Sequence, residues 1–217
     1  MAAAMKQARI VIAAALAASA LVPAALSAQG RAPYTIAESG RSFSRLQDAV
    51  NAIGGGTGTI RIAPGRYADC AVQTEGDVSF VAEVAGQSSL EGEACEDKAA
   101  LVLRGRSTHV EGLVFAGEHS SSGNGAGIRF ESGALVLANC RFLDNEMGLL
   151  SAGQPEMQLA IYGCAFGDAP RHDSGMLHHL LYVGAIGQCV VMHSRFFNGW
   201  RGHLLKSRAR INRILWN

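Results

Sequence analysis

The chain is poor in charged and aromatic residues and carries almost no net charge. Of its 217 residues, 17% are charged and 6% are aromatic, and the formal net charge is +1. This balance excludes a long charged disordered tail and the pervasively basic surface of a general nucleic-acid binder. We therefore expect no nucleic acid among its partners.

Long hydrophobic runs are absent except at the N-terminus. Lys6 and Arg9 precede an apolar run from Ile10 to Leu21, and small residues follow up to Ala28. A membrane-spanning helix needs about 20 apolar residues, so this run is too short. A basic start, a short apolar run and a small-residue end are typical of a signal peptide. We expect residues 1–28 to be a signal peptide, residues 29–217 to be periplasmic or secreted, and no transmembrane segment to remain after cleavage.

Helical periodicity is also scarce. Leu46, Ala49, Val50 and Ile53 recur at helical spacing, and Ser44 with Gln47 fits a capping box, which predicts one short amphipathic helix over residues 44–53. Three glycines, residues 54–56, end it. Short strand patterns follow at residues 59–62 and 78–81, with a Pro-Gly turn between them.

What the chain does have is an internal repeat. Four short segments end in a phenylalanine, 24 to 30 residues apart, at Phe115, Phe142, Phe166 and Phe196. A second strand pattern lies between them, at residues 127–130, 149–152, 180–183 and 204–207. Two interleaved strand patterns with a common period predict a β-solenoid whose coils stack about 4.8 Å apart.

The N-terminal motifs resemble a known superfamily. The pattern Phe43-x-x-Leu46-Gln47-x-Ala49-Val50, followed by residues 58–67 with Pro64-Gly65-Arg66-Tyr67, resembles the start of pectate-lyase-like proteins. The resemblance implies an all-β fold over residues 29–217, namely a right-handed parallel β-helix (solenoid) with a short N-terminal capping helix. That superfamily includes lyases, hydrolases, esterases, epimerases and binding proteins, so the resemblance leaves the activity open.

The second strand series predicts a column of outward-facing side chains. Alternate residues of a strand face opposite sides, so an inward leucine or isoleucine turns its C-terminal neighbour outward. The predicted column consists of Arg129, Ser151, Tyr182 and Lys206, with His179 and His203 at the starts of the last two strands. Such a column is either the floor for an extended polymer or an ordinary solvated face.

Acidic residues are absent from the last 44 residues. Every Asp and Glu lies between Glu38 and Asp173, whereas six cations follow, namely Arg195, Arg201, Lys206, Arg208, Arg210 and Arg213. A basic stripe attracts polyanions, and arginine suits carboxylates. For an exported protein we predict an acidic polysaccharide as the partner of a monomer, with Arg208, Arg201, Arg129 and His179 as substrate-binding residues. The alternative is a solubilising face balanced by acidic residues of coils beyond this sequence.

A second resemblance concerns the last coil. Residues 196–202, Lys206-Ser207 and the following Asn212 resemble the catalytic coil of polysaccharide lyase family six, the alginate and chondroitin lyases. The resemblance implies that Lys206 removes the C5 proton of a uronate, with Ca²⁺ a common cofactor. The chain departs from that family because no carboxylate lies in this region and His203 stands where the family often has Glu.

Two functions therefore stay open. His203 and Tyr182 are alternative acid or base groups for a metal-free β-elimination, which keeps a polysaccharide lyase the favoured enzyme class. If Lys206 and Arg208 only hold carboxylates or sulfates, the protein is instead a noncatalytic acidic-glycan-binding or surface scaffold β-helix protein.

The five cysteines and the acidic loop complete the predictions. Cys70 and Cys95 lie one coil apart and are predicted to form a disulfide, whereas Cys140, Cys164 and Cys189 are predicted to be buried core thiols. No Cys or His spacing supports zinc. The acidic loop at residues 91–97 either holds Ca²⁺ or is solvated. Residues 211–217 resemble the opening of another coil, so we expect the solenoid to continue beyond Asn217.

Overall fold

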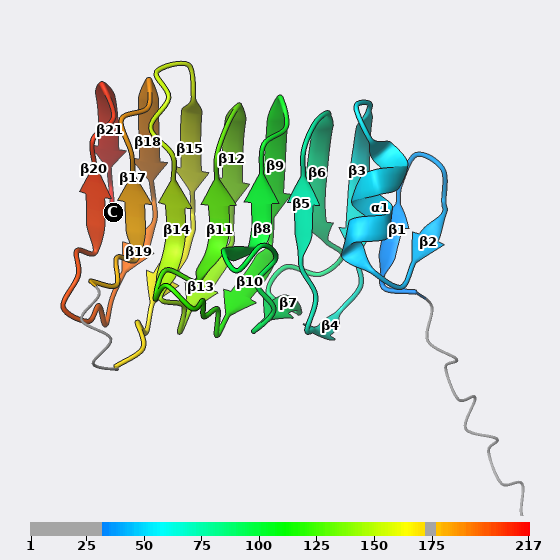
Figure 1. The fold of residues 1–217 in the computed structure, drawn as a ribbon, viewed down its shortest axis with the longest axis horizontal. Helices are drawn as coiled ribbons and strands as arrows, with labels where there is room; N and C mark the ends of the chain where they lie inside the picture. The colour runs from blue at the N-terminus through cyan, green and yellow to red at the C-terminus, as the bar shows by residue number, and fades with distance from the viewer. Residues whose placement is uncertain (1–31, 172–176) are drawn as a thin grey trace, which may run out of the picture.

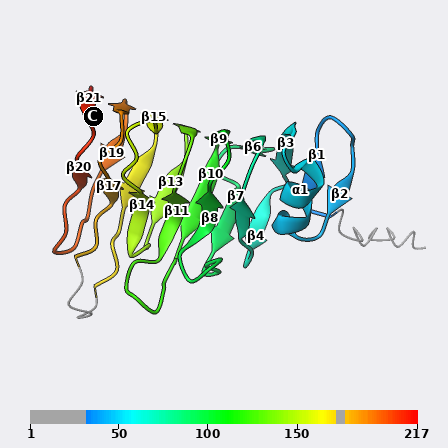
Figure 2. The same ribbon diagram turned by 45° about the horizontal axis from the view of Figure 1, so that its top comes forward.

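The protein is a parallel β-helix, which confirms the predicted fold class. A computed structural model describes residues 32–171 and 177–217. The predicted signal peptide lies outside these residues. Figures 1 and 2 show coils stacked along one axis, with helix α1 (Leu46–Ile53) at the N-terminal end of the stack. No helix in this part of the chain is long and apolar enough to cross a membrane.

Each coil contributes one strand to each of three sheets, which we name A, B and C. From the third strand onward, sheet A is parallel, and it consists of β2 (Ser42–Phe43), β1 (Tyr34–Ile36), β3 (Thr57–Ile62), β6 (Asp77–Ala82), β9 (Ser107–Glu111), β12 (Ala134–Ala138), β15 (Gln158–Tyr162), β18 (Gln188–Met192) and β21 (Ile211–Leu215). Sheet B consists of β4 (Gly65–Tyr67), β7 (Ser88–Glu91), β10 (Leu113–Ala116), β13 (Arg141–Leu143), β16 (Ala165–Gly167) and β19 (Arg195–Phe196). Sheet C consists of β5 (Ala71–Gln73), β8 (Ala99–Leu103), β11 (Ala126–Phe130), β14 (Met147–Ser151), β17 (Leu181–Val183) and β20 (Leu205–Ser207).

The phenylalanine repeat forms a continuous stack inside sheet B. Phe115, Phe142, Phe166 and Phe196 are register partners in successive parallel strands. Their ring centroids lie 4.9, 4.5 and 5.2 Å apart, with the planes within 9° of parallel. One turn of the solenoid therefore corresponds to one repeat of the sequence, as predicted, and the core is a set of stacked columns.

The predicted helix is present as α1 (Leu46–Ile53), but its capping box does not form. The N-cap residue Arg45 makes no side-chain cap, and the Leu46 N–H donates instead to Asp69 Oδ2 at 2.8 Å. Gln47 turns toward sheet C, where its side-chain amide donates to the Val72 carbonyl at 3.0 Å and accepts the Val72 N–H at 2.7 Å. The helix thus satisfies the backbone at the exposed edge of β5, a capping role that protects a sheet edge from other chains.

Cysteines stabilise the early coils and fill the later core. Cys70 and Cys95, the predicted pair, form a disulfide with their Cα atoms 5.5 Å apart. A link of this kind stabilises a fold by about 2–4 kcal/mol. Cys140, Cys164 and Cys189 are buried free thiols, as a core position requires.

Candidate functional site

The outer face of sheet C carries most of the residues that the sequence singles out. The strand register lines up one outward column, which consists of Val72, Val102, Arg129, Leu150, Tyr182 and Lys206. The predicted place of Ser151 in this column is wrong. Leu149 and Leu150 are both leucines, and it is Leu149 that faces inward opposite Ile128. Ser151 consequently lies inside, where its hydroxyl accepts the Gly184 N–H at 2.8 Å and donates to the Ala152 carbonyl at 2.9 Å.

Tyr182 is the centre of a cationic cluster in the last two coils. Lys206 Nζ lies 4.9 Å from the centroid of the Tyr182 ring, and the Arg208 guanidinium carbon lies 5.7 Å from it. An aromatic face attracts cations, so the ring holds both groups on one surface. Lys206 and Arg208 form no ion pair with any carboxylate of the described residues. Their charges are therefore available to an anionic ligand.

Two histidines border this cluster. The His179 ring is stacked against the Tyr182 ring, with centroids 5.5 Å apart. The centroid of the His203 ring lies 5.0 Å from that of the His179 ring. The His203 backbone N–H donates to His179 Nδ1 at 2.9 Å. His179 Nδ1 must therefore carry a lone pair, and the neutral ring bears its proton on Nε2.

Burial keeps His179 neutral. Its side chain is only 6% exposed, and desolvation lowers its pKa from 6.5 to about 4, with further lowering by the charges of Lys206, His203 and His178. His203 Nδ1 lies 3.3 Å from His179 Nδ1. This contact is a hydrogen bond only in the tautomer of neutral His203 that carries its proton on Nδ1, which leaves the lone pair on Nε2. His203 is exposed to solvent, so a ligand bound on this face can approach its ring.

A pocket of about 480 Å³ lies on this face. Four residues that the sequence singled out line it, namely Arg129, Ser151, His179 and Tyr182. It also involves residues that sequence reasoning did not single out as functional, Asn124, Met147, Leu150 and Leu177. Asn124 belongs to the glycine- and serine-rich loop before β11, and such a loop beside a strand column is the one signal that could have indicated it.

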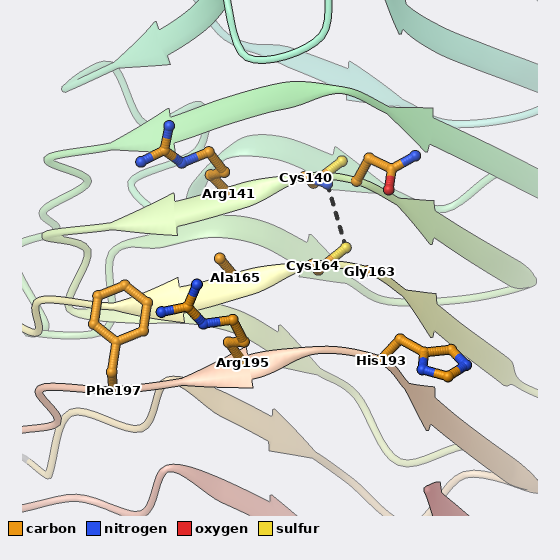
Figure 3. A pocket seen from close by; sticks show the side chains of 9 residues that line it. Cys140, Arg141, Gly163, Cys164, Ala165, His193, Arg195 and Phe197 are labelled. Carbon is orange, nitrogen blue, oxygen red and sulfur yellow. Dashed lines mark hydrogen bonds between the residues drawn. The ribbon is translucent and has the colours of Figure 1, made fainter. Parts of the chain in front are cut away.

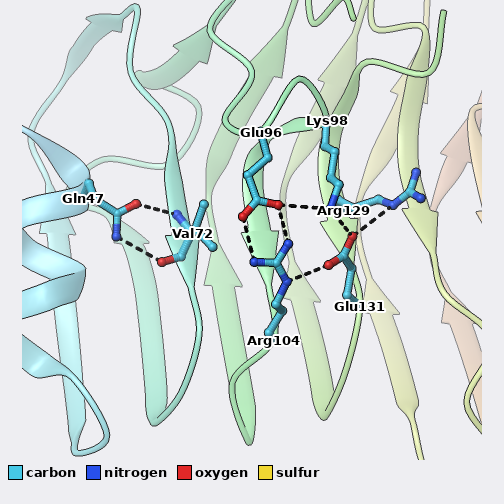
Figure 4. Close-up of polar contacts among 7 residues, drawn as sticks. All are labelled: Gln47, Val72, Glu96, Lys98, Arg104, Arg129 and Glu131. Atoms are coloured by element: carbon cyan, nitrogen blue, oxygen red, sulfur yellow. Dashed lines mark hydrogen bonds and ion pairs between the residues drawn. The ribbon is translucent and has the colours of Figure 1, made fainter. Parts of the chain in front are cut away.

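Arg129 differs from the later cations because a carboxylate lies beside it. Its Nε lies 3.6 Å from Glu131 Oε1, and the same Glu131 pairs with Arg104 at 2.6 Å and Lys98 at 3.1 Å. Figure 4 shows Glu96 completing this network on sheet C. Hydrogen bonds from Arg104 and Lys98 lower the pKa of Glu96 to about 2. Each of these three cations thus has a carboxylate partner, in contrast to Lys206 and Arg208.

Arg201 lies near the histidines but faces another aromatic ring. It forms an isolated parallel bridge with His178, the neighbour of His179. Its guanidinium carbon lies 5.9 Å from the Trp200 ring centroid. The structure therefore places Arg201 beside the cluster and gives it a different aromatic partner from Lys206 and Arg208.

The residues do not fit the calcium site that the family resemblance implies. Within residues 32–171 and 177–217, no three His, Cys, Asp or Glu side chains gather closely enough to hold a metal ion. The acidic loop at residues 91–97 has other partners, since Glu91 pairs with Arg66 and Asp97 accepts the Ser121 N–H at 2.9 Å. We derive no step through a metal ion.

Comparison with known proteins does not assign the chain to a family. No protein-family model matches the chain, and no curated protein and no solved structure matches it. The parallel β-helix is the part of the pectate-lyase-like resemblance that the structure shows.

Proposed function

We propose that this chain is an exported carbohydrate-active protein that binds an acidic polysaccharide on the outer face of sheet C and cleaves it by β-elimination. The observation that carries the proposal is the cluster of Tyr182, Lys206, Arg208, His179 and His203 in the last two coils. It joins cations, an aromatic face and titratable groups beside a pocket.

Substrate binding follows from the cations and the ring. The guanidinium of Arg208 presents a fork that pairs with a uronate carboxylate, and Lys206 adds a second positive charge. The Tyr182 ring holds both cations on one surface before the ligand arrives. Successive coils repeat at about 4.8 Å, so an extended glycan that crosses them meets side chains at regular intervals.

The reaction needs a base, an acid and a cation at the carboxylate. The base takes the proton from C5 of the uronate, the electron pair forms the C4–C5 double bond, and the C4–oxygen bond breaks as the leaving oxygen takes up a proton. Cations beside the carboxylate stabilise the negative charge that develops on it. The Tyr182 hydroxyl is a suitable proton donor for the leaving oxygen.

Two residues compete for the role of base. The resemblance to lyase family six gives this role to Lys206. The geometry also supports His203, because its Nε2 carries the lone pair in the neutral state. A neutral Lys206 would lose its cation–π contact with Tyr182, whereas His203 accepts a proton without losing such a contact.

A second candidate function is noncatalytic binding of an acidic glycan. Lys206 and Arg208 both rest on the Tyr182 ring, and such a platform of cations over an aromatic ring suits recognition without turnover. This candidate uses the same face and the same residues, and it requires no base.

The test is incubation of the purified chain with alginate, polygalacturonate and chondroitin sulfate, followed by the ultraviolet absorbance of the unsaturated product. We expect a signal with at least one polymer, and a loss of about 10²-fold or more in whichever of Lys206→Ala and His203→Ala removes the base. Lys98→Ala is the matched control, because Lys98 already pairs with Glu96 and Glu131.

Three other outcomes separate the candidates. Salt-sensitive binding without product would overturn the lyase and favour the binding protein. Unchanged activity in both variants would remove Lys206 and His203 from the base role. No binding to any of the three polymers at low salt would overturn both candidates.

A further inference from the structure

A second pocket lies on a different face of the solenoid. It has a volume of about 420 Å³ and lies over sheet B, whereas the cluster around Tyr182 lies on sheet C. Figure 3 shows the side chains of Arg141, Arg195 and Phe197 along it, with His193 at its far end. None of these residues belongs to the site described above.

Two arginines frame this pocket because of the strand register. Arg141, Ala165 and Arg195 are register partners in β13, β16 and β19. The two arginine backbones are thus two coils apart, about 9.6 Å, and the small Ala165 leaves the space between them open. A small anionic group placed in this space is within reach of both guanidinium groups.

The charges of these arginines are not neutralised within the described part of the chain. Arg141 and Arg195 are exposed, and neither forms an ion pair with a carboxylate of the described residues. Arg66 occupies the same outward column of sheet B, three coils before Arg141, and its guanidinium pairs with Glu91 at 2.6 Å. The column therefore changes from a neutralised arginine to two available ones.

An aromatic wall completes the pocket. The Arg195 guanidinium carbon lies 6.0 Å from the centroid of the Phe197 ring. The ring rests directly on Gly167, where the Cβ of any other residue would lie 2.3 Å from a ring carbon. Gly167 therefore allows the ring to lie flat at the edge of the pocket, where it offers an apolar face.

Polar groups lie at the opposite edge, at the corner between sheets A and B. Asn139, Gly163 and His193 take the same left-handed conformation in successive coils, with φ of 54°, 61° and 53°. The His193 ring is exposed and is stacked on Trp216, with centroids 5.1 Å apart. Asn139 and His193 thus present hydrogen-bonding side chains to the pocket rim.

We propose that the sheet B pocket binds an anionic saccharide unit. The carboxylate or sulfate group of the saccharide lies between Arg141 and Arg195, and the apolar face of its sugar ring lies against Phe197. The hydroxyl groups of the saccharide face Asn139 and His193. Guanidinium pairs recognise both carboxylate and sulfate, and an aromatic ring beside them selects a sugar over a bare ion. The pocket is independent of the sheet C site and stands if the proposed β-elimination fails.

The test is an NMR titration of the isotopically labelled chain with trigalacturonate, with a sulfated disaccharide and with inorganic sulfate. We expect saturable shifts of the Ala165, Arg195 and Phe197 amide signals with the saccharides, and weaker binding of sulfate alone. The double variant Arg141→Ala/Arg195→Ala should weaken this binding at least tenfold. The saccharide that binds more tightly shows whether the pocket prefers a carboxylate or a sulfate group.

Matched variants keep the two faces apart. Arg66→Ala removes an arginine from the same column and should leave the affinity of the sheet B pocket unchanged. Gly167→Ala displaces the Phe197 ring and should weaken the saccharides more than sulfate. The proposal is overturned if the sheet B signals do not move with either saccharide, or if the double variant binds like the wild type. Signals of Tyr182 and Lys206 report the sheet C site separately in the same experiment.

Discussion

The outer face of sheet C has two regions built on the same backbone column. In the early region, around β8 and β11, each of the three cations Lys98, Arg104 and Arg129 has a carboxylate partner, either Glu96 or Glu131. In the late region, β17 and β20 carry Tyr182 and Lys206, and the chain has no carboxylate after Asp173. The register is continuous through both regions.

The difference teaches that the solenoid by itself does not select a ligand. Both regions present cations on this face, but only the late region leaves Lys206 and Arg208 without a carboxylate partner among the described residues. Surface ion pairs contribute little to stability, typically about 0–1 kcal/mol. The early network therefore matters mainly because it removes free positive charge, and the late cluster matters because it retains it.

The largest expected effect comes from breaking the core that both regions share. Phe142 is 1% exposed and is stacked between Phe115 and Phe166. Phe142→Ala should destabilise the fold by about 3–5 kcal/mol, because it leaves a cavity in a continuous stack. Chemical denaturation measures this loss. Leu204→Ala, at a 45% exposed leucine, is the control and should change stability by less than about 0.5 kcal/mol. An equally small loss for Phe142→Ala would mean that the stack does not stabilise the fold.

The next effect belongs to the early coils, where a buried acid is costly. Glu118 is fully buried, its Oε2 has no hydrogen-bond partner in the described part of the chain, and burial raises its pKa from 4.5 to about 8 despite a hydrogen bond from the Gly92 N–H. The folded state therefore binds more protons than the unfolded state between these values, and stability falls as pH rises from 4.5 to 8. Glu118→Gln should remove this fall and be about 1–3 kcal/mol more stable than the wild type at pH 8.

Urea unfolding at a series of pH values measures the effect of Glu118→Gln. Glu156→Gln, at an exposed position, is the control and should follow the wild-type profile. A Glu118→Gln profile parallel to that of the wild type would contradict the cost assigned to this carboxyl group.

The late region should show the opposite dependence on pH. The pKa of His179 is about 4 in the folded state, against an ordinary value of 6.5. The unfolded state binds more protons between these values, so stability is lost as pH falls from 6.5 toward 4. His179→Gln should flatten this limb, an effect of about 1–2 kcal/mol, while His193→Gln at an exposed position should not. The same unfolding series measures both variants, and an unchanged acid limb in His179→Gln would be evidence against the buried neutral imidazole.

The smallest expected effect comes from a substitution that makes the early region resemble the late one. Glu131→Gln removes the carboxylate that Lys98, Arg104 and Arg129 share. We expect the released charge to tighten low-salt binding of polygalacturonate by about threefold, with little change in stability. Titration calorimetry at two salt concentrations measures the change. Weaker binding in Glu131→Gln would show that free charge on this face does not govern recognition.

Much of the fold was predictable because repeats place equal residues in equal positions. Phe115, Phe142, Phe166 and Phe196 recur at one period, and their rings stack in the structure. The helix over residues 46–53 was predictable from its apolar spacing, but its N-terminal partner Asp69 was not, because that residue lies 23 positions away along the chain.

The site was predictable in part, and the limit was register. Tyr182 and Lys206 are neighbours in the predicted column, but Ser151 is not, since adjacent leucines make the inward position ambiguous. The ion pair of Arg129 with Glu131 joins residues of the same coil, and the contact between His179 and His203 joins adjacent coils. Such contacts depend on side-chain conformation, which periodicity does not encode.

The most direct test of the central claim compares the two lysines of the described chain. Lys98 pairs with Glu96 and Glu131 in the early region, and Lys206 belongs to the late cluster. In a low-salt titration with polygalacturonate and alginate, Lys206→Ala should weaken binding about tenfold or more, while Lys98→Ala should stay within about twofold of the wild type. Equal losses in the two variants, or a loss confined to Lys98→Ala, would contradict the assignment of the acidic glycan to the late region of sheet C.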